Sequence, residues 1–297
     1  MVGRERFNST ANGLMQYPKV MDVESSELNQ GFLSYKVSEE TIATVGRQRI
    51  IFDNARFVGN VGWRQNEQTF DVLMITNKSL PSTEVKFAYL GAVNNIQAKH
   101  VGMKGPLLNV SYSGFSAGKL IGYSYMLDVD NSTADTQTLG VRFSGKQMAG
   151  DVGLLYSAEF ATQNDYTLLE GGVAVAGVTA KVGYELLSGD GTDGFATPLA
   201  TKHAFNGWAD KFLGTPINGL EDTYLSVMGK VAGIKLLGVY HRYSADSSGA
   251  DYGTEMNLLA AKKFTKHYSV GVKYASYDAD TVSVDTDKLW MWAQASF

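Results

Sequence analysis

The chain has 297 residues, of which 44% are hydrophobic and 19% charged, and its formal net charge is −4. This acidic balance argues against a nucleic-acid-binding protein that relies on bulk positive charge, and the absence of cysteine excludes disulfide frameworks and thiolate metal sites. The 32 glycines and 16 tyrosines suit an all-β outer-membrane protein and also a soluble β protein, so the pattern along the chain has to decide between them.

Residues 1–27 are polar and aperiodic, which predicts an extracellular loop-like segment. They include no apolar stretch of the kind found in a signal peptide, and no later apolar run reaches the roughly 18 to 20 residues of a membrane-spanning helix. We therefore expect either a mature chain or one whose beginning is missing.

Residues 28–297 consist of about 15 segments of about 10 residues, the length of a tilted strand that crosses a bilayer. Their hydrophobicity alternates with a period of two: Val85, Phe87 and Tyr89 share one face, and Glu84 and Lys86 share the other. Elsewhere the polar face holds much Gly, Ser and Ala, which suits a water-filled lumen better than open solvent. The expected strands are 28–37, 41–51, 67–77, 83–93, 106–115, 118–127, 136–145, 151–161, 166–176, 178–188, 221–231, 234–243, 253–264, 268–278 and 287–297.

Tight turns alternate with long loops along these segments, and the longest loops are 52–66 and 189–220. Short turns on one side and long loops on the other are typical of outer-membrane barrels. The sequence therefore predicts an all-β fold, a single antiparallel transmembrane β-barrel domain spanning 1–297. Seven tyrosines fit its interfacial aromatic girdle: Tyr112, Tyr123, Tyr125, Tyr156, Tyr184, Tyr268 and Tyr274.

The last segment ends in LWMWAQASF, with apolar residues at every second position up to Phe297. Such an ending resembles the signal that the bacterial barrel-assembly machinery reads, so we expect that machinery as a partner. Single-chain bacterial barrels have an even number of strands with both ends in the periplasm. An odd count in this chain predicts that an odd number of strands precedes residue 1.

Several stretches carry a family resemblance: ELNQGFLSY (27–35), VGRQRIIFDNARFVGNVGWRQNEQTFD (45–71), LIGYSYMLD (120–128) and TPLATKHAFNGWADKFL (197–213). Together they resemble the alginate-export family of outer-membrane porin-like proteins, in its marine gammaproteobacterial branch. The resemblance implies a barrel of about 18 strands behind a signal peptide, with about three strands missing here. It also implies export of anionic alginate through an arginine-lined lumen, to which Arg47 and Arg49 of the GRQR motif would contribute.

Arg47 and Arg49 are expected to face water, because on the lipid face each would cost roughly 2 to 4 kcal/mol at the midplane. A bulge near Gly46 would bring them to the lumen side. There they either attract passing carboxylates or phosphates, or pair with acids of the wall and stiffen it. The acids considered are Asp71, Glu159, Glu185 and Glu255, and the further lumen cations expected from alternation are Lys86, Arg142, Lys181, Lys230, Arg242 and Lys273.

The loop 197–216 is long and motif-like, and we expect a short helical turn at 209–212. It either constricts the channel mouth or packs against the rim through Phe205, Trp208 and Phe212. Mouth residues would then be Arg56, Arg64, His203, Trp208, Asp210 and Lys211. A hydrolytic pair of His203 with Asp210 is disfavoured, because neither a nucleophile motif nor metal-ligand spacing accompanies it.

The sequence thus predicts a passive outer-membrane channel for anionic polysaccharide or smaller anionic solutes, embedded in outer-membrane lipid. We expect no enzymatic activity, cofactor, metal or nucleic-acid partner. The alternatives are a general-diffusion porin without alginate specificity and, less favoured, an outer-membrane enzyme or a soluble β-sandwich binding protein.

Overall fold

The computed structural model describes residues 7–16, 19–130 and 135–296. Its described residues form one sheet of 15 strands in sequence order, as the alternation predicts, and each strand pair whose register is resolved is antiparallel. The strands are β1 (Gly31–Lys36), β2 (Thr41–Gln48), β3 (Thr69–Asn77), β4 (Thr83–Asn94), β5 (His100–Phe115), β6 (Gly118–Val129), β7 (Thr136–Ala149), β8 (Val152–Thr162), β9 (Asp165–Val175), β10 (Val178–Leu187), β11 (Leu220–Val231), β12 (Ile234–Ser244), β13 (Asp251–Lys263), β14 (Tyr268–Ala279) and β15 (Thr286–Ala295). In the described part of residues 1–27 no strand of this sheet is present, as expected for a loop-like segment.

Two local predictions are wrong. β5 starts at His100 rather than at residue 106, because Gly105 adopts a φ of +138° and the strand continues through it. No helical turn forms at 209–212; the one short 3₁₀ helix of the described residues, η1, covers Lys202–Ala204 instead. Asn206 and Asp210 have φ values of +50° and +60°, in the left-handed region that ends a right-handed turn.

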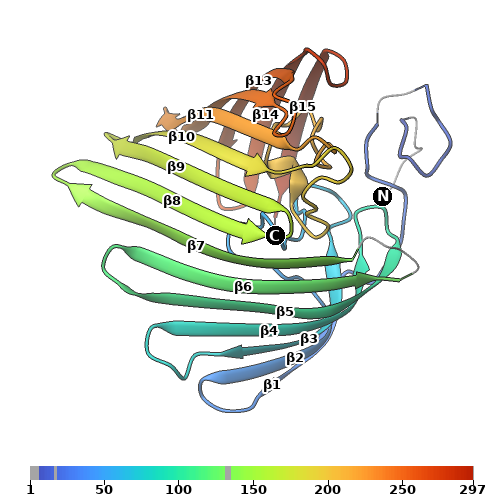
Figure 1. The fold of residues 1–297 in the computed structure, drawn as a ribbon, viewed down its shortest axis with the longest axis vertical. Helices are drawn as coiled ribbons and strands as arrows, with labels where there is room; N and C mark the ends of the chain where they lie inside the picture. Colours follow the sequence, from blue (N-terminus) through green and yellow to red (C-terminus); the bar gives the residue numbers. More distant parts are fainter. Residues whose placement is uncertain (1–6, 17–18, 131–134, 297) are drawn as a thin grey trace. The chain divides into compact units, whose positions relative to one another are not determined.

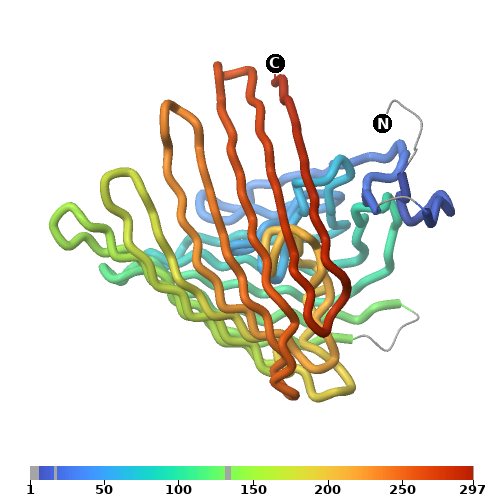
Figure 2. The backbone as a smooth tube through the Cα atoms, turned by 90° about the horizontal axis from the view of Figure 1, so that it is seen from above, coloured from blue at the N-terminus to red at the C-terminus, as the bar shows by residue number. Residues whose placement is uncertain are grey.

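The chain divides into two compact units. Unit 1 contains residues 1–114, 121–139 and 197–202, and unit 2 contains 115–120, 140–196 and 203–297. In unit 1, β1 to β4 lie side by side in sequence order (Figure 1, blue to cyan). In unit 2, β11 to β15 form the run of long, neighbouring strands drawn in orange and red in Figure 2.

In each unit the two faces of the sheet carry different side chains, and we call them the outer and the inner face, as defined here for unit 2. The outer face carries aliphatic side chains that are exposed, such as Val227 (45%) and Leu258 (48%). The inner face carries charged side chains that are buried, such as Asp222 (1%), Glu255 (1%) and Lys273 (7%). The registers place Leu225 opposite Tyr240 on the outer face and Asp222 opposite Tyr243 on the inner face, so the two sets remain separated from strand to strand.

Unit 1 shows the same division. Leu73 lies opposite Tyr89 on the outer face, and both are exposed. Val72 lies opposite Leu90 on the inner face, and both are buried. In the described residues no helix is long and apolar enough to span a membrane.

Candidate solute path on the inner face

The loop between β2 and β3 packs against the inner face of unit 1. The ring of Phe52 stacks on Tyr125 at 5.9 Å between centroids, and the ring of Phe57 lies 5.3 Å from that of Tyr123. Asn109 donates a hydrogen bond to Asp53 of the loop at 2.8 Å. Tyr123 and Tyr125 are each only 3% exposed beneath this loop, so the prediction that these two belong to an interfacial girdle is wrong.

Arg47 and Arg49 are both held in ion pairs. Arg47 contacts the two carboxylate oxygens of Asp71 at 2.8 and 2.9 Å, and it also donates to the Leu28 carbonyl. Arg49 contacts both oxygens of Glu67 at 2.8 and 2.6 Å. Gly46 has a φ of +122° at the position where a bulge was expected, but the pairing of β2 with β3 continues through it, and the register shift lies between Asp71 and Val72 of β3. This is the arrangement expected of arginines that stiffen the wall, and their role in attracting solutes stays a prediction.

Glu67 is the centre of a larger network at the end of this loop. Asn29 and Asn60 donate hydrogen bonds to it at 2.8 and 2.6 Å, in addition to those from Arg49. Burial by itself would raise the pKa of Glu67, but the three donors outweigh burial and hold the pKa below its ordinary value. The carboxylate therefore stays charged and fastens the loop to the segment before β1.

Three further cations predicted along the solute path, Lys86, Lys181 and Arg142, have acidic neighbours. Lys86 lies 2.9 Å from Glu84, and Lys181 lies 2.8 Å from Glu170. Arg142 pairs with Glu159, whose side chain is 1% exposed. Each pair combines residues of the inner face, so the wall carries alternating charges rather than a line of free cations.

The two arginines predicted at the channel mouth have little access to solvent. Arg56 is 2% exposed, and Arg64 is half-buried with its backbone N–H donating to the Val61 carbonyl. Burial, and then the charge of Arg56, lower the pKa of Lys202 in η1. Arg56 therefore acts within the packed interior of unit 1.

In unit 2, the loop 203–213 is fastened to the inner face by three carboxylates of the wall. Asn206 donates from one amide nitrogen to Glu185 at 2.6 Å and to Asp222 at 3.1 Å. The backbone N–H of Ala209 donates to Glu255 at 2.7 Å. Asp222 and its partner His241, 2.9 Å apart, were missed by the sequence interpretation, although both lie at inner-face positions of their strands.

Aromatic packing fixes the end of the same loop. Phe212 lies 4.5 Å from Tyr243, 5.9 Å from Tyr252 and 6.0 Å from Tyr277 between ring centroids. Lys211 donates to Ser283 at 2.9 Å and lies over the Tyr277 ring. Phe212 and Trp208 thus pack as expected, and the loop covers part of the inner face of unit 2.

His203 and Asp210, predicted as mouth residues, lie 2.5 Å apart. The ammonium group of Lys273 lies 2.7 Å from Nε2 of His203 and 3.9 Å from the centre of the Trp208 ring, while Lys288 binds the other oxygen of Asp210 at 3.1 Å. Burial opposes ionisation of Asp210, but His203 and Lys288 keep its pKa below the ordinary value. Both ring nitrogens of His203 therefore have close neighbours, with Nδ1 beside Asp210 and Nε2 beside Lys273.

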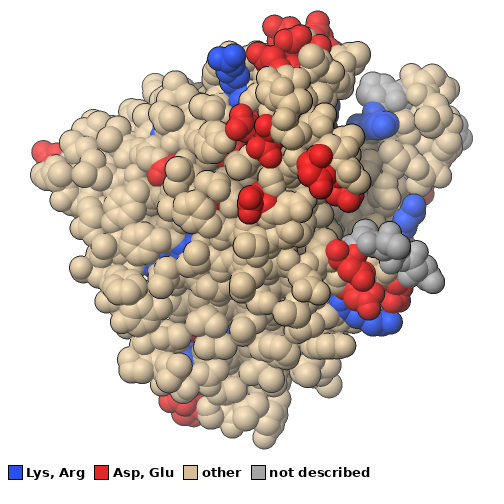
Figure 3. Space-filling model, in the orientation of Figure 1, with Lys and Arg blue, Asp and Glu red and all other residues tan. Residues whose placement is uncertain are grey.

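Within residues 7–16, 19–130 and 135–296, no group of three or more His, Asp or Glu side chains is placed to hold a metal ion. Phe297, the predicted assembly signal, lies outside the described residues. Figure 3 shows that the surface over β8 and β9 in this view is mostly uncharged, in agreement with the exposed Leu154, Leu169 and Val173 of these strands.

The sequence matches no protein-family model, and the comparison with curated proteins found no similar sequence. The resemblance to the alginate-export family therefore stays a prediction. Solved structures of Pseudomonas aeruginosa proteins do resemble the chain. OccK10 (OpdN) aligns with a TM-score of 0.67 at 14% identity, over 87% of this chain and 81% of its own.

Two further solved structures resemble the chain to a similar degree. OpdQ of P. aeruginosa aligns with a TM-score of 0.66 at 12% identity, over 90% of this chain and 81% of its own. The outer membrane protein OpdK of the same organism aligns with a TM-score of 0.63 at 13% identity, over 88% of this chain and 79% of its own. Together with the antiparallel 15-stranded sheet, these likenesses show that the chain has the fold of an outer-membrane β-barrel porin.

Proposed function

We propose that the protein is a passive channel of the bacterial outer membrane. The observation that carries this proposal is the distribution of side chains over the two sheet faces: aliphatic residues are exposed on the outer face and charged residues are buried on the inner face. A soluble protein would show the opposite arrangement, since monomers rarely expose large contiguous apolar patches. Lipid against the outer face and water along the inner face account for both halves of the pattern.

The solutes that this channel favours are small and anionic. On the inner face of unit 2, lysine and arginine outnumber the carboxylates of the strands. The cations there are Arg142, Lys146, Lys181, Lys230, Lys235, Lys263, Lys273 and Lys288, and the carboxylates are Glu159, Glu170, Glu185, Asp222 and Glu255. A positive excess on a low-dielectric wall concentrates anions locally even when the whole chain is acidic. The structure of OpdK with vanillate, a carboxylate, shows such a solute on a protein of this fold.

Diffusion without alginate specificity is the second candidate. It is favoured because Arg47 and Arg49 each engage a carboxylate with two nitrogens, which leaves fewer donors for a polysaccharide. Passage of an alginate-like chain, as the resemblance implies, would require these arginines to exchange their acidic partners for those of the solute. Export and uptake are equally compatible with a passive channel.

Planar-bilayer recording of the purified protein tests both candidates. We expect stepwise conductance with a reversal potential that indicates anion selectivity. In a Lys86→Gln, Lys181→Gln double variant we expect the reversal potential to shift by several millivolts in the direction of cation selectivity. Absence of conductance from the folded protein would refute the channel. Block by oligoalginate that disappears in an Arg47→Ala, Arg49→Ala variant would favour the polysaccharide. Selectivity and block that this variant leaves unchanged would rule out the arginines as determinants.

A further inference from the structure

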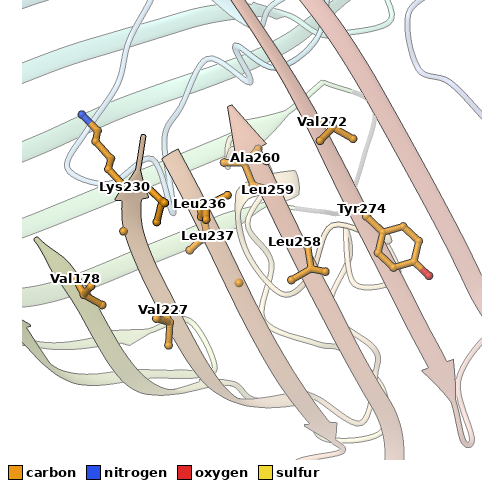
Figure 4. A pocket seen from close by; sticks show the side chains of 13 residues that line it. Val178, Val227, Lys230, Leu236, Leu237, Leu258, Leu259, Ala260, Val272 and Tyr274 are labelled. Carbon is orange, nitrogen blue, oxygen red and sulfur yellow. The ribbon is translucent and has the colours of Figure 1, made fainter. Parts of the chain in front are cut away.

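A groove crosses the outer face of unit 2 near the short turns. It has a volume of about 500 Å³ and an almost wholly apolar lining, in which Val178, Val227, Leu236, Leu258 and Val272 come from five successive strands, β10 to β14. Since neighbouring strands are about 4.8 Å apart, the groove extends for about 19 Å across them. Figure 4 shows these side chains on β10 to β14, with Tyr274 at one end.

Two glycines create the space. Gly229 and Gly238 both line the groove, and a β-carbon at either position would have no atom nearer than a side-chain methyl at 3.5 Å, that of Val178 or Leu258 respectively. Neither glycine has a positive φ, so the backbone does not need glycine there. The missing side chains leave a depression in an otherwise continuous aliphatic surface.

The groove ends beside positive charge. Lys262 follows Ala260 by two residues in β13 and therefore lies on the same outer face, where it pairs in register with Ile234 and Val270. Its ammonium group lies over the Phe264 ring at 5.6 Å. Lys230 lies at the edge of the groove but belongs to the inner face, where it pairs in register with Lys235, and in Figure 4 its side chain extends away from the apolar residues. Lys262 precedes a short turn, one of the periplasmic connections in barrels of this fold.

We propose that this groove binds an anionic phospholipid of the periplasmic leaflet, with one acyl chain in the apolar depression and the phosphate at Lys262. A second copy of this chain fits less well, because a two-fold contact at this place would bring the lysines of both copies together. The proposal depends on the membrane location proposed above, but its test measures lipid retention, whereas the test of the channel measures conductance.

The test is native mass spectrometry of the full chain purified in detergent, with phosphatidylglycerol or phosphatidylcholine added. The wild-type protein is expected to retain phosphatidylglycerol preferentially. Lys262→Gln is expected to weaken that retention about 5-fold, since a lysine near an anionic lipid surface contributes about that factor. A Gly229→Leu, Gly238→Leu variant, whose groove is filled, is expected to lose retention of both lipids.

Matched controls are available in the same unit. Lys235→Gln removes an equal charge from the inner face, opposite Lys230, and Gly171→Leu adds the same bulk at an open position of β9 outside the groove. Both are expected to retain phosphatidylglycerol like the wild type.

Equal retention by Lys262→Gln and Lys235→Gln, or by the filled and control glycine variants, would overturn the inference. The inference would also be overturned if the wild-type protein formed dimers and the Gly229→Leu, Gly238→Leu variant did not, because the groove would then bind a second copy of the chain. Normal conductance in a protein without lipid preference refutes this inference alone, whereas lipid retention without conductance refutes only the channel.

Discussion

Two loops cover the inner face, one in each unit, and they are fastened in opposite ways. The loop before β3 brings its own charges, since Arg49 and Glu67 lie at its two ends and pair with each other. The wall beneath it supplies aromatic rings, Tyr123 and Tyr125. The loop 203–213 instead reaches three carboxylates of the wall through neutral donors, the amide of Asn206 and the backbone N–H of Ala209.

This difference determines what each loop would uncover if it moved. Release of the first loop would expose a tyrosine-rich wall, on which solutes could stack. Release of the second would expose Glu185, Asp222 and Glu255 without the N–H groups that now neutralise them. Movement of the second loop would therefore change how acidic the inner face of unit 2 is, and movement of the first would change how aromatic the inner face of unit 1 is.

The largest effect is expected from Asn206→Asp. The new carboxylate would replace an amide that lies 2.6 and 3.1 Å from two other carboxylates, and we expect a loss of about 4 kcal/mol in loop anchoring. Asp also tolerates the left-handed backbone of residue 206, so the change removes the donor and adds a charge without backbone strain. Tryptic cleavage after Lys211 should accelerate about 100-fold or more, measured by mass spectrometry of the fragments.

Asn206→Ala is the control for that experiment, because it removes the donors without adding charge, and it should fall between the wild type and Asn206→Asp. Cleavage after Arg56 should not change in either variant. Equal cleavage rates for all three proteins would show that the wall carboxylates do not hold the loop.

A smaller effect is expected from Phe57→Ala in the other loop. The phenylalanine is 9% exposed against Tyr123 and Tyr125, and its truncation should weaken packing by about 3 kcal/mol. Trypsin should then cleave faster after Arg56 and Arg64 but not after Lys211. Cleavage at Lys211 that rises in parallel would contradict independent anchoring of the two loops.

The smallest effect is a dependence on acid pH. Because the folded-state pKa of Asp210 lies below its ordinary value, its contribution is complete above an unfolded pKa of about 3.9 and is lost as pH falls through the folded value. Cleavage after Lys211 by an acid-active protease, or current noise in bilayers, should therefore increase below about pH 4. In Asp210→Asn, the part of this increase that comes from protonation of Asp210 should be absent. If the variant shows the same increase at acid pH as the wild type, other groups cause the increase.

Alternation of residue types along the chain was enough to predict the all-β barrel fold, nearly every strand and the separation of the two faces. The reason is that a strand has a side-chain period of two and a membrane imposes opposite chemistry on its two sides. Val85, Phe87 and Tyr89 could be assigned to one face without any knowledge of their neighbours. An irregularity near Gly46 was also expected, because a charged pair had to be reconciled with that period, but the register shift lies between Asp71 and Val72 of β3.

The fastening of the loops was decided only by tertiary structure. Asn206 contacts Glu185 and Asp222 across 21 and 16 residues of chain, and no local periodicity encodes which carboxylate a loop amide will reach. The same holds for Tyr123 and Tyr125, whose aromatic character predicts a membrane girdle or a loop contact equally well until the loop is in place. The groove beside Lys262 likewise depends on register, because Gly229 and Gly238 produce a cavity only when five strands are aligned. Sequence determined which residues share a face, and the register and the loop paths decided which of them meet.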